Sequence, residues 1–211
     1  MMEPPFLPAL SLKSRYFVTG RTQTGKSTLA RDLAKKLSSA GPPLLIIDPK
    51  DDDITKIKGC ERFSDPLRIP PSDAVFTPSD STDIDAYRSL FAQFVGPGKW
   101  RPRTYWIDEA GSVLPQSGLN REARTLLAQG SGKGIPVIMC HTRPCEIDVN
   151  SRAQATDIIA FETPSSKDRR IIADTAGIDI TEIDPLLRPG GMEDHSAIFC
   201  QGAKMWIISP S

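Results

Sequence analysis

The fold of this chain is decided by the stretch Arg15-Tyr16-Phe17-Val18-Thr19-Gly20-Arg21-Thr22-Gln23-Thr24-Gly25-Lys26-Ser27. Residues 15–19 are rich in β-branched and aromatic side chains, which predicts a strand. Residues 20–27 match the pattern G-x-x-x-x-G-K-[ST] in full. Leucines then recur every four residues at Leu29, Leu33 and Leu37, which is the spacing of one helical face. A strand, this loop and a helix in that order predict a site for the phosphates of a nucleotide.

Each fixed position of the loop has a physical role in holding phosphate. Gly20 and Gly25 permit the backbone angles and the close approach that let successive N–H groups surround an anion. Lys26 supplies positive charge to the β and γ phosphates, and the Ser27 hydroxyl is expected to bind Mg²⁺ at the positive end of the following helix. We expect ATP as the ligand, with contacts from Gly20, Arg21, Thr22, Gln23, Thr24, Gly25, Lys26, Ser27 and Thr28.

Strands and helices alternate along the rest of the chain. Gly41-Pro42-Pro43 ends the first helix, and the wholly apolar run 44–47 predicts a strand buried on both faces. Between 51 and 79 the pattern is weak, with 74–77 as one strand candidate. Further strands are predicted at 104–107, 135–140 and 157–161, helices at 82–95 (with Thr82 as N-cap), 119–128 and 167–175, and a terminal hairpin at 197–200 and 205–208.

This alternation predicts right-handed βαβ units and a mostly parallel sheet covered on both faces. The expected fold class is α/β: a three-layer α/β/α P-loop NTPase of the RecA/ASCE type, with a C-terminal hairpin and with phosphates bound at the carboxyl ends of the strands. A length of 211 residues suits one domain. We therefore expect a single ATPase domain over 1–211, with a core at 14–162 and a helical and hairpin extension at 163–211.

The apolar strand at 104–107 ends in two carboxylates, Asp108 and Glu109. Asp108 is expected to hold Mg²⁺ opposite Ser27, because an acid at the end of a strand does this in phosphate-transfer sites. Side chains alternate along an extended chain, so Glu109 points elsewhere and is expected to polarise a water for attack on the γ phosphate. No Arg-rich lid for a second substrate is visible in the sequence, which favours hydrolysis over phosphoryl transfer to a small molecule.

Three further segments accompany the loop and the acidic pair. The second predicted strand ends in Ile46-Ile47-Asp48-Pro49-Lys50, residues 134–144 have the sequence GIPVIMCHTRP, and Glu146-Ile147-Asp148-Val149 precedes the apolar strand at 157–161. With these segments, the chain from about Arg15 to Phe161 resembles the HerA/FtsK superfamily of DNA-translocating ATPases, especially its small viral genome-packaging members.

The resemblance implies further residues of the site. A polar residue at the end of the family's fourth strand senses the γ phosphate, and the register of the Arg-Pro pair places Thr142 there, with His141 beside it. The resemblance also implies a homo-oligomeric ring, in which a basic residue of one subunit completes the site of the next. Ser131 stands where the family has its Arg, so the candidates for this role are the nearby basic residues Arg121, Arg124, Lys133 and Arg143.

Composition limits the partners of the chain. Lys plus Arg is 26 and Asp plus Glu is 26, so bulk charge does not hold the protein to nucleic acid and any DNA contact must be local. No run is apolar enough to span a bilayer, the first six residues lack the features of a signal peptide, and the four cysteines form no CxxC pair. The sequence predicts a soluble cytoplasmic protein (host cytoplasm for a viral one) without a membrane segment or zinc site.

The expected function is Mg²⁺-dependent ATP hydrolysis that drives double-stranded DNA into a viral capsid, with a capsid or portal protein as a partner. Contacts to DNA phosphates carry no sequence specificity, and the candidate loops for them are Gly111–Asn120 and Lys99–Arg103. One alternative is a conjugative, plasmid or filamentous-phage assembly motor. Another is a nucleotide-binding regulator or kinase without DNA translocation.

Overall fold

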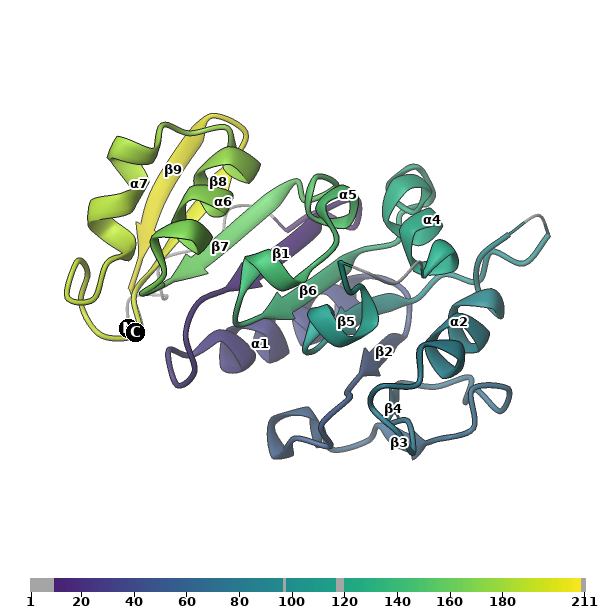
Figure 1. Ribbon diagram of the computed structural model, residues 1–211. Helices are drawn as coiled ribbons and strands as arrows, with labels where there is room; N and C mark the ends of the chain where they lie inside the picture. The colour runs from purple at the N-terminus through teal and green to yellow at the C-terminus, as the bar shows by residue number, and fades with distance from the viewer. Residues whose placement is uncertain (1–9, 97, 117–119, 210–211) are drawn as a thin grey trace.

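The computed structural model describes residues 10–96, 98–116 and 120–209 of the chain. The described strands form one sheet in the order β3-β4-β2-β5-β6-β1-β7-β8-β9 (Figure 1). The strands are β1 (Arg15–Thr19), β2 (Leu44–Ile47), β3 (Glu61–Phe63), β4 (Ala74–Phe76), β5 (Thr104–Ile107), β6 (Val137–His141), β7 (Asp157–Phe161), β8 (Ala197–Gln201) and β9 (Lys204–Ile208). The pairs from β3 to β7 are parallel, and β8 and β9 are antiparallel additions.

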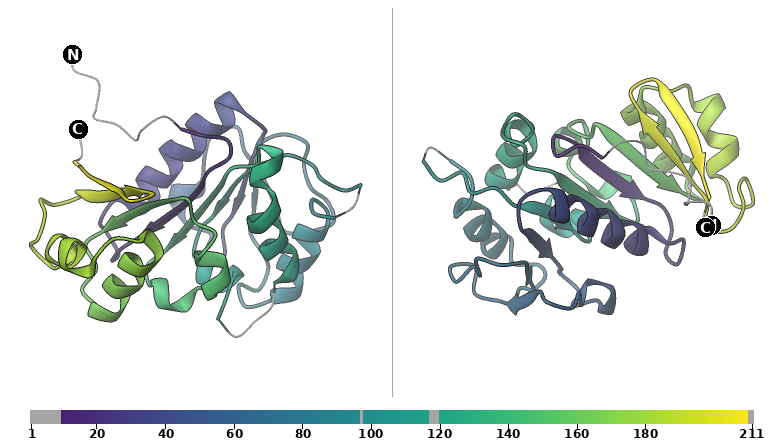
Figure 2. Two further views of the ribbon diagram at one scale, coloured as in Figure 1. Left: turned by 90° about the horizontal axis from the view of Figure 1, so that it is seen from above. Right: turned by 180° about the vertical axis from the view of Figure 1, so that it is seen from behind.

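Helices cover both faces of this sheet. They are α1 (Lys26–Ala40), α2 (Ile84–Ala92), α3 (Ala110–Val113), α4 (Arg121–Gln129), α5 (Val149–Arg152), α6 (Ser166–Ala176) and α7 (Ile180–Leu187), with 3₁₀ turns η1 (Asp53–Thr55), η2 (Ser131–Lys133) and η3 (Pro144–Glu146). Helix α1 lies on one face, and α2, α4, α6 and α7 lie on the other (Figures 1 and 2).

The two layers of core follow from the alternation of side chains along buried strands. In β1, Phe17 packs into the cluster that contains α2, α4, α6 and α7, whereas Tyr16 and Val18 pack against α1. The leucine stripe of α1 supplies Leu33 and Leu37 to this second cluster. The predicted three-layer α/β/α P-loop fold with a mostly parallel sheet and a C-terminal hairpin is therefore confirmed.

Strand order decides which loops meet. Strand β6 lies between β1 and β5 and is parallel to both, with Val137 paired to Arg15 on one side and to Tyr105 on the other. The carboxyl ends of the three strands consequently share one edge of the sheet. The loop that follows β1 and the residues that follow β5 lie on either side of the end of β6 at this edge.

The predicted element at 82–95 differs from the structure at both ends. Helix α2 begins at Ile84, and its N-cap is Asp83, whose carboxylate accepts hydrogen bonds from the backbone N–H groups of Asp85 (2.9 Å) and Ala86 (3.1 Å). Thr82 is not the cap, because its hydroxyl donates to the Asp80 carboxylate at 2.7 Å instead. The helix ends at Ala92, before the predicted end.

Other boundaries and elements refine the prediction. Strand β5 and strand β7 have their predicted bounds, and the candidate at 74–77 is β4. Helix α4 starts at Arg121 with Asn120 as its N-cap; Leu119, its predicted first residue, lies outside the described residues, as do residues 1–6. The sequence pattern missed β3, α3, α5 and α7.

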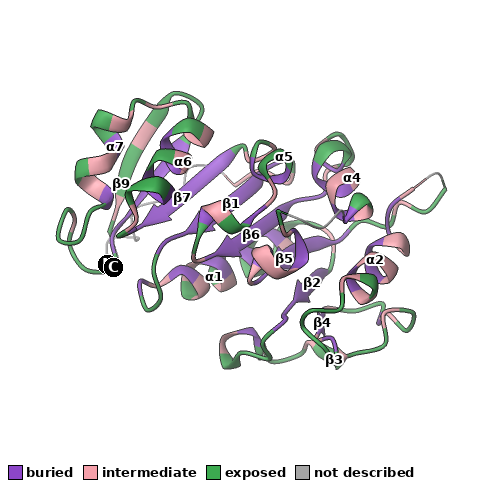
Figure 3. Cartoon of the chain, in the orientation of Figure 1, coloured by how far each residue is buried: buried purple, intermediate pink, exposed green. Residues whose placement is uncertain are grey.

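The C-terminal extension joins the same sheet through β8, which pairs with β7. Burial falls from the central strands to the outer strand β9, whose residues are all exposed or half-buried (Figure 3). The single domain over 1–211 and its division at residue 162 stay predictions. No described helix has the length and apolar character needed to cross a bilayer.

Both predicted DNA loops include residues that belong to the packed fold. Arg103 is buried and donates to the carbonyl oxygens of Pro70 (2.5 Å) and Ser72 (2.6 Å), so its prediction as a DNA contact is wrong. Trp100 of the same loop packs against the core, with the Lys133 ammonium 4.7 Å from the centre of its ring. The other loop begins inside α3, and its residues 117–119 lie outside the described residues.

Candidate nucleotide-binding site

The loop Gly20–Ser27 requires glycine at both of its fixed glycine positions. Gly20 has φ +138°, and a Cβ there would lie 2.6 Å from Cβ of Phe161, because the end of β7 passes directly beside the loop. Gly25, the N-cap of α1, has φ +97°. Both φ values lie in the region that side chains with a Cβ rarely adopt. These two positions let the chain turn from β1 into α1.

Hydrogen bonds within the loop fix its shape. The Thr24 hydroxyl donates to the carbonyl oxygen of Arg21 at 2.8 Å, and the Lys26 ammonium donates to the same oxygen at 2.6 Å. Arg21 itself is paired with Glu162 at 2.7 Å, next to the end of β7. Lys26 is 9% exposed, and its burial lowers the pKa of the ammonium. A bound anion would compete with the Arg21 carbonyl for this ammonium group.

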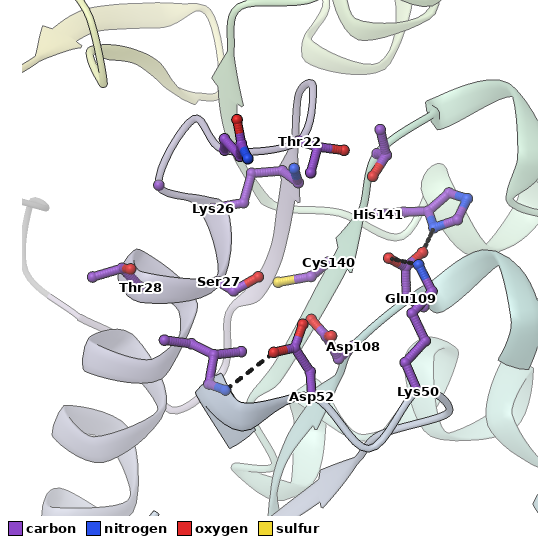
Figure 4. A pocket seen from close by; sticks show the side chains of 14 residues that line it. Thr22, Lys26, Ser27, Thr28, Lys50, Asp52, Asp108, Glu109, Cys140 and His141 are labelled. Carbon is purple, nitrogen blue, oxygen red and sulfur yellow. Dashed lines mark hydrogen bonds and ion pairs between the residues drawn. The ribbon is translucent and has the colours of Figure 1, made fainter. Parts of the chain in front are cut away.

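One pocket of about 330 Å³ brings the predicted site residues together (Figure 4). Its lining includes Thr22, Gln23, Gly25, Lys26, Ser27 and Thr28 from the loop and α1, and Asp108, Glu109, His141 and Thr142 from the ends of β5 and β6. In Figure 4, Asp52 and Asp108 lie together below Ser27, with Cys140 beside them. Gly20, Arg21 and Thr24 do not line it; Arg21 and Thr24 line a smaller neighbouring pocket together with His195.

Four further residues line the main pocket although the sequence pattern did not assign them a role: Lys50, Asp52, Ile54 and Cys140. Cys140 lies in β6, and the other three follow β2. Their common signal is position, because each lies at or just after the carboxyl end of a strand of the parallel sheet. In the sequence, this position was marked by the Asp-Pro-Lys segment that follows the second strand.

Asp108 is a buried carboxylate without a partner among the described residues. Its residue is 5% exposed, and its side chain forms no hydrogen bond or ion pair with any residue that the structure describes. Burial, reinforced by the neighbouring charges of Glu109, Asp48 and Asp52, raises the pKa of Asp108 to about 7. A cation beside this carboxylate would offset the repulsion.

The residues present fit Mg²⁺. The ion prefers oxygen ligands and in phosphate sites is bound by one or two carboxylates together with substrate phosphates and waters. Ser27, Asp52 and Asp108 offer such oxygens to one pocket. Among the described residues, no group of three His, Cys, Asp or Glu side chains is arranged to hold a metal alone. A site shared with the substrate is therefore the arrangement that this donor set suits.

The buried charge of Asp108 predicts a pH-dependent stability. The carboxyl titrates near pH 4 in the unfolded chain and near pH 7 in the folded one, so unfolding releases a proton between these values and stability falls as pH rises through this window. An asparagine amide at this position does not titrate. We expect Asp108→Asn to stabilise the nucleotide-free protein by about 1–3 kcal/mol at pH 8 and by far less at pH 5.

The measurement is thermal unfolding at both pH values with a metal chelator present. Asp32→Asn, at an exposed position of α1, serves as the control and is expected to change stability little at either pH. A gain for Asp108→Asn that is equal at pH 5 and pH 8 would contradict the buried, unpaired carboxylate.

Glu109 is held by two partners. Its Oε1 accepts a hydrogen bond from the Lys50 ammonium at 2.6 Å, and its Oε2 lies 3.1 Å from Nδ1 of His141. The contact with His141, followed by Lys50, lowers the pKa of Glu109 to about 2 against the opposing effect of burial. In this state Glu109 is a constrained carboxylate rather than a free base.

His141 extends this chain of contacts to the surface. Its Nε2 lies 2.9 Å from Oε2 of Glu146 in η3. The residue is 6% exposed, so its ring is buried and not solvated. Both residues predicted to sense the γ phosphate, His141 and Thr142, line the pocket, and His141 is the one in contact with Glu109.

Asp48 organises the segment that follows β2. It is fully buried and accepts hydrogen bonds from the backbone N–H groups of Lys50 (3.1 Å) and Asp52 (2.9 Å) and from the Thr55 hydroxyl (2.6 Å). These bonds turn the chain so that Lys50 and Asp52 both reach the pocket. The Asp of the Asp-Pro-Lys segment therefore acts on the site through the backbone that it holds.

The four basic residues proposed to act on a neighbouring subunit differ in their contacts. Arg124 forms two hydrogen bonds to Asp148, at 3.0 and 2.9 Å, and Arg143 pairs with buried Asp168 at 3.3 Å. Lys133 lies over the ring of Trp100. Arg121 is exposed, and none of the described residues pairs with its side chain.

Comparison with known proteins gives structural neighbours but no sequence relatives. No protein-family model matches the chain, and no curated protein matches it. The genome packaging NTPase B204 from Sulfolobus turreted icosahedral virus 2, solved in complex with ATP-gammaS, is similar in structure with a TM-score of 0.78 and 16% identity. The match covers 96% of this chain and 100% of that chain.

Two further neighbours are more distant. VirB4 of Thermoanaerobacter pseudethanolicus has a TM-score of 0.65 and 12% identity over 93% of this chain and 89% of that chain. The pCW3 conjugation coupling protein TcpA, solved with ATPgS, has a TM-score of 0.62 and 14% identity over 93% and 60% of the two chains. At these identities the likeness shows the fold alone, and a viral genome packaging NTPase has this fold, as the resemblance in the sequence predicted.

Proposed function

We propose that this chain is a Mg²⁺-dependent ATPase whose hydrolysis moves double-stranded DNA, and that its role is viral genome packaging. The observation that carries the proposal is the single pocket in which the Gly20–Ser27 loop faces Asp108 and Glu109 across the end of β6. The full-length likeness in fold to a genome packaging NTPase solved with ATP-gammaS supports the choice of nucleotide and of process.

In this proposal, the residues divide the work of hydrolysis. The backbone N–H groups of the loop and the Lys26 ammonium bind the β and γ phosphates. Ser27 and Asp108 hold Mg²⁺, which when bound neutralises charge that develops on the phosphates. Glu109 orients a water and accepts its proton as the water oxygen bonds to the γ phosphorus and the bond to the ADP oxygen breaks. His141 or Thr142 responds to the presence of the γ phosphate.

The site would be completed in a homo-oligomeric ring. A cation from a neighbouring subunit stabilises charge in the transition state. Arg121 is the best of the four candidates for this role, because Arg124, Arg143 and Lys133 already have partners within their own chain. The ring would contact DNA phosphates without sequence preference, in the cytoplasm of the host cell, and dock on a capsid or portal protein.

The experiment is an ATPase assay with and without linear double-stranded DNA, combined with light scattering to measure the oligomeric state. We expect Mg²⁺-dependent hydrolysis that DNA of unrelated sequences stimulates equally, together with assembly of the chain in the presence of nucleotide or DNA. The Lys26→Ala variant controls for contaminating ATPases. A monomer at every protein concentration, with no response to DNA, would favour the nucleotide-binding regulator instead.

A conjugative motor is the second candidate function. It is favoured by the likeness in fold to VirB4 and to a conjugation coupling protein. Both TM-scores are below that of the packaging NTPase, and the coupling protein is matched over only 60% of its chain. Co-purification with capsid or portal protein rather than with conjugation proteins would separate the two candidates.

A further inference from the structure

The ion pair between Lys50 and Glu109 joins two residues with opposite roles toward a triphosphate. Lys50 lines the same pocket as Lys26, and its ammonium lies 2.6 Å from Oε1 of Glu109. Figure 4 shows the Lys50 side chain extending toward Glu109 at the β6 side of the pocket. The lysine that could bind an entering phosphate is therefore the one that now holds the carboxylate proposed to activate water.

The backbone of Lys50 is held in place, whereas most of its side chain is exposed. Its backbone N–H donates to the buried Asp48 carboxylate, which holds the Lys50 backbone in place. The side chain is 60% exposed, so redirecting its ammonium group disrupts little packing. A lysine with a fixed backbone and an exposed, flexible stem can exchange one oxygen partner for another within the same pocket.

A triphosphate competes well for this ammonium group. Glu109 offers one negative charge, and its other carboxylate oxygen already lies 3.1 Å from Nδ1 of His141. The terminal phosphate of a nucleoside triphosphate carries more negative charge on three oxygens, and charge-assisted hydrogen bonds to such oxygens are among the strongest in proteins. Lys26 is in a comparable state, since its ammonium is bonded to the Arg21 carbonyl oxygen at 2.6 Å. Both lysines of the pocket are thus held by protein oxygens that an anion can replace.

We propose that Lys50 is a second phosphate-binding lysine, which leaves Oε1 of Glu109 for the terminal phosphate of a nucleoside triphosphate and thereby releases this oxygen to act on water, while Oε2 stays against His141. This inference rests on the proposed function of the site. Lys50 then distinguishes a triphosphate from a diphosphate, because a diphosphate leaves the Lys50–Glu109 pair intact and a triphosphate breaks it. Glu109 is then restrained whenever the pocket holds no triphosphate.

The test compares affinities for ATP-gammaS and ADP, each with Mg²⁺, by calorimetry on the full chain. In Lys50→Met, the ratio of the ATP-gammaS affinity to the ADP affinity is expected to fall about tenfold or more, because a charged contact to the third phosphate is lost and Glu109 is left without its cation. Affinity for ADP is expected to change less than about threefold. Lys50→Arg is expected to restore most of the ratio, since the guanidinium also binds phosphate.

The matched control is Lys56→Met. Lys56 pairs with Asp53 at 2.6 Å in the same segment but does not line the pocket, so its loss is expected to leave both affinities unchanged. An unchanged ratio in Lys50→Met, or an equal fall for both nucleotides, would overturn the role of Lys50. If Lys50→Met gives one of these two results while Lys26→Ala abolishes binding, the proposed nucleotide site stands and only the Lys50 inference fails. If Lys26→Ala binds both nucleotides as the parent does, the proposed site and the inference fail together.

Discussion

Replacing Lys26 with alanine is expected to weaken ATP binding by roughly a hundredfold or more and to abolish hydrolysis. Lys26 is buried at the start of α1, in a pocket that also contains Asp52, Asp108 and Glu109. Without its ammonium, Lys50 is the one lysine among the described residues of the pocket that offsets these acids, and a triphosphate meets net negative charge as well as losing charge-assisted hydrogen bonds.

Calorimetry with ATP-gammaS and Mg²⁺ measures the affinity, and circular dichroism checks that the variant is folded. Lys36→Ala, an exposed lysine on the same helix, is the control and is expected to bind as the parent does. Parental hydrolysis by Lys26→Ala would remove Lys26 and its loop from the catalytic site.

Glu109→Gln is expected to keep ATP binding and to lower hydrolysis at least about a hundredfold, the usual scale for loss of a general base. The amide cannot accept a proton, yet it retains the size of the side chain and an oxygen for Lys50. Since the negative charge facing the phosphates also disappears, affinity for ATP is expected to stay equal or to rise.

Single-turnover hydrolysis separates the two effects, because it reports chemistry independently of binding. Glu182→Gln, an exposed position in α7, is the control for a general loss of function. Turnover by Glu109→Gln at the parental rate would refute the proposed role of Glu109, and another group in the pocket would then have to activate the water.

The central part of this fold was predictable because its signals are local. The Gly20–Ser27 loop matches a fixed pattern, and the leucine stripe and the apolar strands have clear periods. Strand β5 was predicted with its bounds, and the acidic pair follows it directly. In a parallel sheet such residues gather at the carboxyl edge, so their meeting in one pocket follows from strand order.

The remaining elements depend on contacts that are distant in sequence. Strand β3 has three residues, all exposed or half-buried, and exists through its pairing with β4. Helix α7 contains Pro185, a residue that argues against a helix. The cap of α2 illustrates the limit at one position: Thr82 and Asp83 are both good caps, and the bond from Thr82 to Asp80 leaves the role to Asp83.

The candidate site was predictable in its parts but not in its connections. The sequence indicated Asp108, Glu109 and His141 separately, and nothing in it pairs Glu109 with Lys50 or His141 with Glu146. The choice among basic residues was equally hidden, because the partners of Arg124 and Arg143 are Asp148 and Asp168 from later segments. Side-chain pairing of this kind is decided by tertiary packing, which the spacing of residues does not encode.

The arrangement of the loop and the two acids around one nucleotide is the claim on which the account depends. A crystal structure of the protein with ATP-gammaS and Mg²⁺ tests it most directly. We expect the β and γ phosphates against the backbone N–H groups of Gly20–Ser27, Mg²⁺ between Ser27 and Asp108, and Glu109 beside the γ phosphate. A nucleotide bound elsewhere, or phosphates in the loop with both acids turned away from them, would contradict the account.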